Sequence, residues 1–143
     1  MREILFRGKR ADDNEWVFGD LEHNGNHIPK FVDGYTIAPS TVGQFTGLTD
    51  KNGKKIFEGD IIKSDNGKQS AVSVVKFGEN YPKMFYRMLD MSSPGRKHLP
   101  AIGFYAESVD KGEEMILFQS PCVTVIGNVH DNPELLEVNV NAQ

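Results

Sequence analysis

The chain has few of the features by which membrane proteins and secreted proteins are usually recognised. Its 143 residues include a single cysteine, Cys122, which excludes an intramolecular disulfide framework and a zinc site built from cysteines. No stretch approaches the roughly 18 apolar residues of a membrane span. The apolar run at residues 4–6 is too short for a signal peptide. We therefore expect a cytoplasmic protein without membrane contact, in which Cys122 is a small buried thiol.

Positive charge is also in short supply. Sixteen lysines and arginines face 20 aspartates and glutamates, for a formal net charge of −4. This balance argues against capture of nucleic acid or an anionic membrane by the molecule as a whole, although it leaves room for a local basic patch. Fourteen glycines and seven prolines indicate many tight turns, which favour short strands over long helices.

Catalytic and metal-binding motifs are missing. His23 and His27 are four residues apart, but the turn sequence between them does not suit the helix that such a pair of ligands needs. The chain has no His-Glu-x-x-His motif, no nucleophile elbow and no phosphate-binding loop. We therefore predict no enzymatic activity, catalytic residue, metal or cofactor. The alternative, a metal-dependent hydrolase, would require Asp20 and Asp60 to meet as a carboxylate pair.

What the chain does contain is a doubled pattern. A Gly-Asp-apolar signature occurs at residues 19–21 and 59–61, and an apolar-Gly-amide-apolar signature at residues 42–45 and 126–129. Gly-Asp before a strand is a turn device, whereas a glycine inside an apolar strand marks a bulge or a close approach of another backbone. The pattern predicts a mainly β fold of duplicated small SH3-like or curved β-barrel units.

Strand signals fill most of the chain, as short apolar or alternating runs separated by Asn-Gly and Asp-Gly pairs. The expected strands cover residues 4–7, 16–22, 28–32, 35–37, 41–48, 56–63, 70–77, 115–118 and 122–129. Pro29 lacks a ladder donor, so it predicts an edge position for its strand. Asn132 before Pro133, with Glu134 in the first turn, predicts a short C-terminal helix at about residues 133–138.

The two repeats differ in length. We expect one domain over residues 1–143, with a first β unit at about 1–50 and a second at about 51–138. The surplus of the second unit falls at about residues 78–114, which we interpret as an insertion. Its aromatic and methionine side chains favour packing on this chain or on a partner. They are Tyr81, Met84, Phe85, Tyr86, Met88 and Met91.

The signatures resemble those of the YopX family of small phage and prophage proteins. The matching segments lie in the first 63 residues and the last 20 or so. They are residues 6–10, 15–21, 41–48, 50–54, 56–61, 125–129 and 132–136. Residues 64–122 match no fixed pattern. The resemblance implies a mainly β protein of phage or prophage origin that acts in the bacterial cytoplasm, and it brings no catalytic residues.

Two functions follow as expectations. The first is a non-enzymatic protein-binding or assembly module that self-associates and contacts a host or phage protein, because exposed strand edges and an apolar insertion favour association. The alternative is a nucleic-acid-binding accessory factor that combines basic and stacking side chains. Its candidate residues are Lys51, Lys54, Lys55, Lys83, Phe85, Tyr86 and Arg87.

Overall fold

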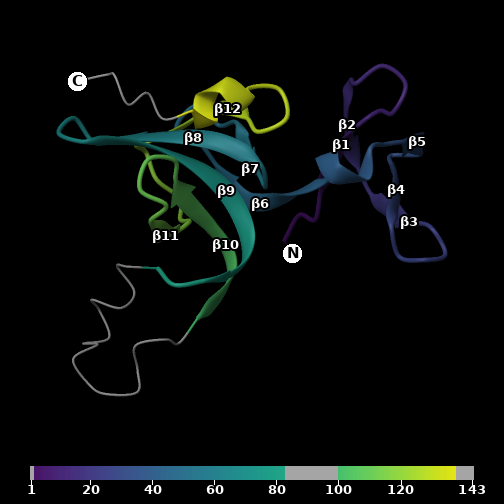
Figure 1. The fold of residues 1–143 in the computed structure, drawn as a ribbon, viewed down its shortest axis with the longest axis horizontal. Helices are drawn as coiled ribbons and strands as arrows, with labels where there is room; N and C mark the ends of the chain where they lie inside the picture. The colour runs from purple at the N-terminus through teal and green to yellow at the C-terminus, as the bar shows by residue number, and fades with distance from the viewer. Residues whose placement is uncertain (1, 83–99, 138–143) are drawn as a thin grey trace. The chain divides into compact units, whose positions relative to one another are not determined.

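The protein is mainly β, and the strands in its described residues pair antiparallel in three sheets (Figure 1). A computed structural model describes residues 2–82 and 100–137. The chain divides into two compact units. Unit 1 comprises Met1–Leu48 with Lys55–Phe57, and unit 2 comprises Thr49–Lys54 with Glu58–Gln143.

Unit 1 contains a four-stranded and a three-stranded sheet. The first has the order β2 (Trp16–Gly19), β1 (Phe6–Lys9), β6 (Gly43–Thr49), β7 (Lys55–Phe57). The second has the order β3 (Leu21–His23), β4 (Pro29–Val32), β5 (Tyr35–Thr36), and a 3-10 turn, η1 (Pro39–Thr41), precedes β6. Val32, Ile37, Phe45, Ile56 and Phe57 are buried as its apolar core.

A cation is part of this core. Arg7 is only 6% exposed, and its guanidinium carbon lies 4.6 Å from the Trp16 ring centroid and 4.9 Å from that of Phe57. Phe57 also contacts Phe18 and Phe45, with ring centroids 5.5 and 5.7 Å away. Aromatic faces attract a cation most strongly where water is excluded, so Arg7 acts here as a packing residue.

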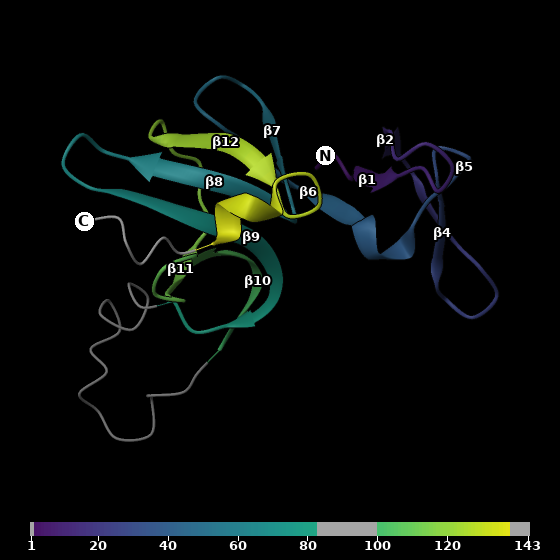
Figure 2. The same cartoon turned by 45° about the horizontal axis from the view of Figure 1, so that its top comes forward.

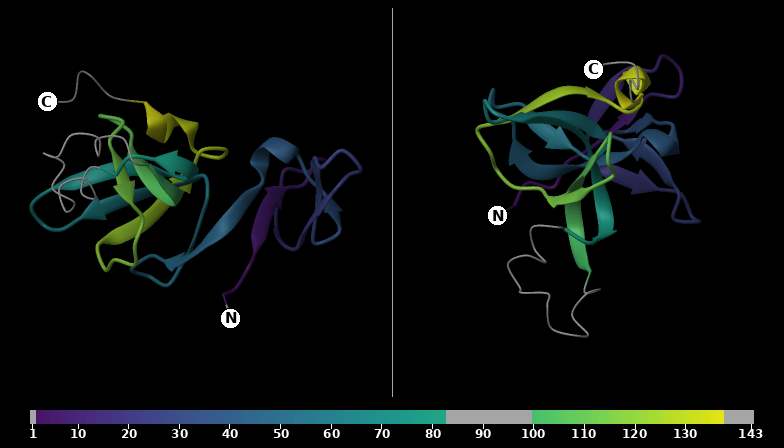
Figure 3. Two further views of the ribbon diagram at one scale, coloured as in Figure 1. Left: turned by 90° about the horizontal axis from the view of Figure 1, so that it is seen from below. Right: turned by 60° about the vertical axis from the view of Figure 1, so that its left-hand side comes forward.

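Unit 2 is built on one five-stranded sheet. Its order is β11 (Glu114–Ile116), β10 (Ala101–Ser108), β9 (Ser70–Asn80), β8 (Asp60–Asp65), β12 (Val123–Asn128). Figure 2 shows β8 between β9 and β12, with the 3-10 turn η2 (Pro133–Leu136) following β12. In Figure 3 the far ends of β9 and β10 run side by side as a two-stranded ribbon, in agreement with their register up to Asn80 and Ala101.

Both Gly-Asp signatures mark equivalent points of the topology. β2 and β7 are the two edge strands of the four-stranded sheet, and after each of them the chain passes through Gly-Asp into a strand of another sheet. Gly59 has a φ of 90°, a conformation that other residues rarely adopt. The two apolar-Gly-amide-apolar segments do not occupy equivalent positions. The segment in β12 pairs with β8, the strand that the chain enters through Gly59-Asp60, whereas the segment in β6 pairs with β1.

Several sequence predictions need correction. The described strands form open sheets, not closed barrels, because the terminal strands of each sheet do not pair with one another. Pro29 lies in β4, the middle strand of its sheet, but only at the strand's first residue, where β5 does not reach. Residues 133–136 form a 3-10 turn, and the Asn132 side chain does not cap it. Instead, the side-chain Oδ1 of Asn132 accepts a hydrogen bond from the Asn128 backbone N–H.

One long strand is missing from the prediction. β10 lies inside the stretch interpreted as an insertion and pairs with β9 over its whole length. The alternation of Ile102, Phe104 and Ala106 along it is the period-2 signal of a strand. Met84, Phe85, Tyr86, Met88 and Met91, for which packing was expected, lie outside the described residues.

Candidate functional site: a groove on the unit 2 sheet

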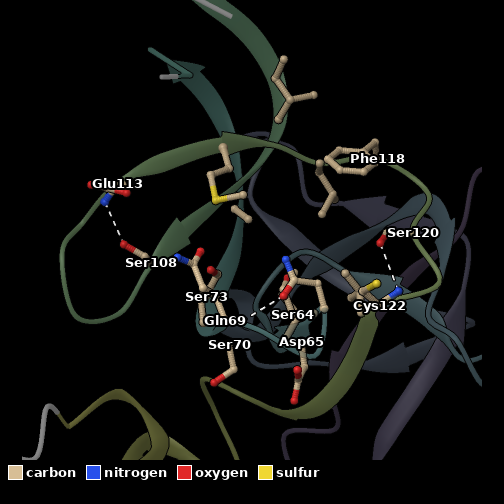
Figure 4. A pocket seen from close by; sticks show the side chains of 18 of the residues that line it. Ser64, Asp65, Gln69, Ser70, Ser73, Ser108, Glu113, Phe118, Ser120 and Cys122 are labelled. Atoms are coloured by element: carbon tan, nitrogen blue, oxygen red, sulfur yellow. Dashed lines mark hydrogen bonds between the residues drawn. The ribbon is translucent and has the colours of Figure 1, made fainter. Parts of the chain in front are cut away.

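One face of the unit 2 sheet is hollowed into an open groove of about 600 Å³ (Figure 4). Its floor follows the strand register across β8, β9 and β10. Ile62 lies opposite Ser73, which lies opposite Ser108, and in the next row Ser64 lies opposite Ala71. All five of these side chains line the groove.

The groove exists because its floor residues are small. A sheet face that packs into a core carries branched or aromatic side chains, which fill the space above the strands. Here serine and alanine occupy most of the floor positions, so the space above them stays open. Ser73, Ala106 and Ser108 are nevertheless buried, with 4%, 6% and 7% of their surfaces exposed. Most of the surface of these three residues is therefore covered by neighbouring protein atoms, and only a small part of it faces the groove.

One wall of the groove is formed by the connection from β11 to β12. It contributes Phe118, which is 55% exposed, and Cys122. Gln119 fixes this connection, because its Nε2 donates to the Thr49 carbonyl at 2.8 Å and its Oε1 accepts from the Thr49 N–H at 3.1 Å. The Ser120 hydroxyl accepts a hydrogen bond from the Cys122 N–H at 3.1 Å. The wall is thus held by side-chain to backbone bonds.

The serine hydroxyls of the floor differ in what they do. Ser108 Oγ accepts a hydrogen bond from the Glu113 N–H at 2.9 Å, so it holds the turn between β10 and β11. The Ser73 hydroxyl, although 96% of the residue is buried, makes no hydrogen bond within the part of the chain that the structure describes. The Ser73 Oγ keeps a small accessible surface in the groove, so it is available to a ligand there.

Acidic side chains dominate the rim. Asp65 comes from the hairpin between β8 and β9, and Asp110 and Glu113 come from the turn between β10 and β11. Lys111 is the single basic residue among the side chains that line the groove. In Figure 4 the labelled Asp65 and Glu113 lie on different sides of the floor. The groove is therefore negatively charged around an apolar and hydroxyl-lined floor.

The edge of β12 is covered by a turn built on Asp50. Its Oδ2 accepts from the Val125 N–H at 3.0 Å, and its Oδ1 accepts from the N–H groups of Asn52 and Lys54 at 2.8 and 3.0 Å. The Lys51 N–H donates to the Val123 carbonyl at 2.9 Å. Burial raises the pKa of Asp50, but these three backbone hydrogen bonds and the charge of Lys54 outweigh it and lower the pKa below the ordinary value of 3.8.

Three of the seven residues predicted for nucleic-acid binding lie in the described part of the chain. Lys51 and Lys54 are exposed on the Asp50 turn of unit 2. Lys55 belongs to unit 1, where its Nζ lies 3.9 Å from Glu3 and 5.5 Å from the Phe45 ring centroid. The other four candidates, Lys83, Phe85, Tyr86 and Arg87, lie outside the described residues.

The other candidates from the sequence have structural explanations. Asp20 is an exposed residue of unit 1, whereas Asp60 is a buried residue of unit 2. His23 and His27 are exposed at one hairpin. Within residues 2–82 and 100–137 no group of three metal-binding side chains is found. Cys122 is half-buried on the groove wall, because its strand begins only at Val123, and this corrects the prediction of a buried thiol.

Sequence reasoning missed the groove. The signal was present as small side chains at every second position, in Ala71 and Ser73 and again in Ala106 and Ser108. Its meaning depends on the register that aligns these strands, and residues 64–122 match no motif that would fix that register.

Comparisons with known proteins support a family. The sequence model of the family described as YopX protein matches residues 3–137. The crystal structure of protein EF1440 from Enterococcus faecalis is similar at a TM-score of 0.49 and 22% identity, over 96% of this chain and 100% of that one. No curated protein matches the chain significantly. None of the helices in the described parts of the chain has the length and apolar character to cross a membrane.

Proposed function

Because the chain belongs to the YopX family, whose matched segment contains the whole groove, we propose that it is a non-enzymatic protein-binding module of phage or prophage origin. The groove on the unit 2 sheet is the binding site, and an extended segment of a host or phage protein in the bacterial cytoplasm is its ligand. The observation that carries the proposal is the combination of an open floor of small side chains with the Ser73 hydroxyl, which has no hydrogen-bond partner among the described residues.

The dimensions and chemistry of the groove suit a peptide backbone. Small floor residues let a backbone approach the sheet closely, as glycine and alanine do where chains pack against one another. Met115 and Phe118, which are 38% and 55% exposed, offer apolar surface to side chains of the ligand. An extended peptide presents alternate side chains to such a surface and leaves its backbone polar groups for a hydroxyl partner.

A test uses the single cysteine of the chain as a reporter. Peptides selected on the full-length protein from a random display library should slow the reaction of Cys122 with a thiol reagent, because Cys122 lines the groove. Ala71→Phe places a ring on the floor and should abolish both binding and protection. Val72→Phe, one residue along β9 and outside the groove lining, is the matched control and should bind normally.

Two results would contradict the proposal. One is that the selected peptides leave the reactivity of Cys122 unchanged. The other is that Ala71→Phe binds them as well as the unaltered chain does. Circular dichroism and thermal unfolding of both variants show whether each retains its fold.

The nucleic-acid alternative stays a prediction. It requires that single-stranded oligonucleotides bind at low salt, that binding weakens as salt rises, and that Lys54→Glu combined with Lys55→Glu abolishes it. A flat titration at low salt would exclude it.

The duplication of SH3-like units also stays a prediction. The equivalent positions of the two Gly-Asp pairs favour it, whereas the different pairing of β6 and β12 argues against it.

A further inference from the structure

Resting on the proposed peptide-binding function, we infer that the partner of the groove is a basic segment, an extended chain that alternates lysine or arginine with apolar residues. The inference comes from the sign and position of the charges around the floor. Asp65, Asp110 and Glu113 oppose only Lys111 among the lining residues. These acids come from two turns at the same end of the sheet, one that follows β8 and one that follows β10.

The position of the charges fits an extended ligand. Asp65 ends β8, and its Oδ1 accepts from the Gly67 N–H at 2.9 Å, which holds the carboxylate at the hairpin. Asp110 is exposed in the turn between β10 and β11. A peptide that runs across the strands at this end of the sheet has one carboxylate on the β8 side and others on the β10 side, with Ser73 on β9 between these two strands. Cationic side chains on that peptide would remain partly in water while their stems cover the apolar wall.

The same charges disfavour other ligands. Phosphates of a nucleic acid or side chains of an acidic segment would be placed beside carboxylates, and like charges across an interface lower affinity. A free cation would not use the apolar surface of Met115 and Phe118. A basic peptide is the ligand that uses the rim, the wall and the floor together.

The experiment compares three labelled synthetic peptides in which valine alternates with lysine, glutamine or glutamate. Fluorescence anisotropy measures binding to the full-length protein at low and high salt, and the rate of Cys122 modification reports whether the groove is occupied. The lysine peptide should bind about tenfold tighter than the glutamine peptide, since each partly exposed ion pair contributes a fraction of a kcal/mol to about 1 kcal/mol. High salt should reduce this difference.

A variant pair identifies the source of the preference. Asp65→Asn with Asp110→Asn keeps side-chain oxygen acceptors at both positions and should bring the lysine peptide close to the affinity of the glutamine peptide. Asp12→Asn with Asp13→Asn removes two exposed acids of unit 1 and should change nothing. If the first pair fails to fold, the peptide series and its salt dependence on the unaltered chain still decide the question.

The outcomes separate the two claims. If all three peptides protect Cys122 and bind with equal affinity, the basic partner is wrong and the groove remains a binding site. If the glutamate peptide binds best, the inference is also overturned. If no peptide protects Cys122, and none selected from the display library does so, the proposed function itself fails.

Discussion

The Asp50 carboxylate accepts a backbone hydrogen bond at a sheet edge, where otherwise a further strand would pair. Its two oxygens accept three backbone N–H groups, including that of Val125 on the edge of β12, and the residue is 4% exposed. A bare strand edge invites pairing with other chains, so this turn also protects the edge from non-specific association. The sequence predicts the turn at Asn52-Gly53, but not this role of Asp50, because Val125 is 75 residues away in the chain.

Asp50→Asn should destabilise unit 2 by about 2 kcal/mol, because an amide nitrogen replaces one charged acceptor of buried hydrogen bonds. Urea-induced unfolding measured by circular dichroism gives the change in the free energy of unfolding. Asp12→Asn, at an exposed carboxylate, is the control and should stay within about 0.5 kcal/mol of the unaltered chain. Equal effects of the two substitutions would contradict the assigned role of Asp50.

The same residue makes a prediction about pH. The pKa of Asp50 is lowered in the folded protein, so its contribution to stability is complete above the ordinary pKa of 3.8 and is lost as the pH falls through the folded-state pKa. Unfolding free energies measured from neutral pH down to about pH 3 should fall less steeply for Asp50→Asn than for the unaltered chain. Parallel curves would show that Asp50 does not titrate in this way.

At the scale of elements, the end of β12 explains why a glycine, Gly127, stands in the apolar-Gly-amide-apolar signature of residues 126–129. The register of β12 with β8 shifts between Val125 and Gly127, which is the bulge that a glycine inside an apolar strand predicts. A Cβ on Gly127 would lie 2.5 Å from Asn132 Oδ1, the atom that accepts the Asn128 N–H. The glycine therefore makes room for the turn that follows the strand.

Gly127→Ala should cost about 1–3 kcal/mol, because the new methyl group displaces the Asn132 side chain and leaves the Asn128 N–H without its acceptor. Asn132→Gly removes the obstructing side chain, so adding Gly127→Ala to Asn132→Gly should cost clearly less. Thermal unfolding of the four proteins in this double-mutant cycle measures the coupling. Additive effects would show that the two residues do not interact.

For the whole molecule, one exposed apolar feature of the described residues is the far end of the β9–β10 ribbon. Phe77 and Ile102 are 54% and 77% exposed, and the Phe77 and Phe104 rings lie 4.9 Å apart across the two strands. β8 and β11 do not pair with this part of the ribbon. An exposed apolar surface of this kind favours association between proteins, so we propose that it mediates the self-association expected from the sequence.

Phe77→Thr with Ile102→Thr should weaken self-association about tenfold or more, since burying each side chain contributes about 1.5–3 kcal/mol. Sedimentation velocity over a range of concentrations measures the change. Ile28→Thr removes an apolar residue of similar exposure (47%) from a hairpin of unit 1 and should have no effect. An unaltered chain that stays monomeric at high concentration would rule out self-association through this surface.

The sequence by itself determined the family, the mainly β character and most turns, because these depend on residues close together in the chain. Asp33-Gly34 has positive φ at both residues, as its dipeptide indicates, and Gly127 marks a bulge. The tertiary structure decided what depends on register between distant strands. It aligned Ile62 with Ser73 and Ser108 to make the groove, it brought Asp50 to β12, and it left the sheets open. Strand pairing joins residues far apart in sequence, so local patterns do not encode these outcomes.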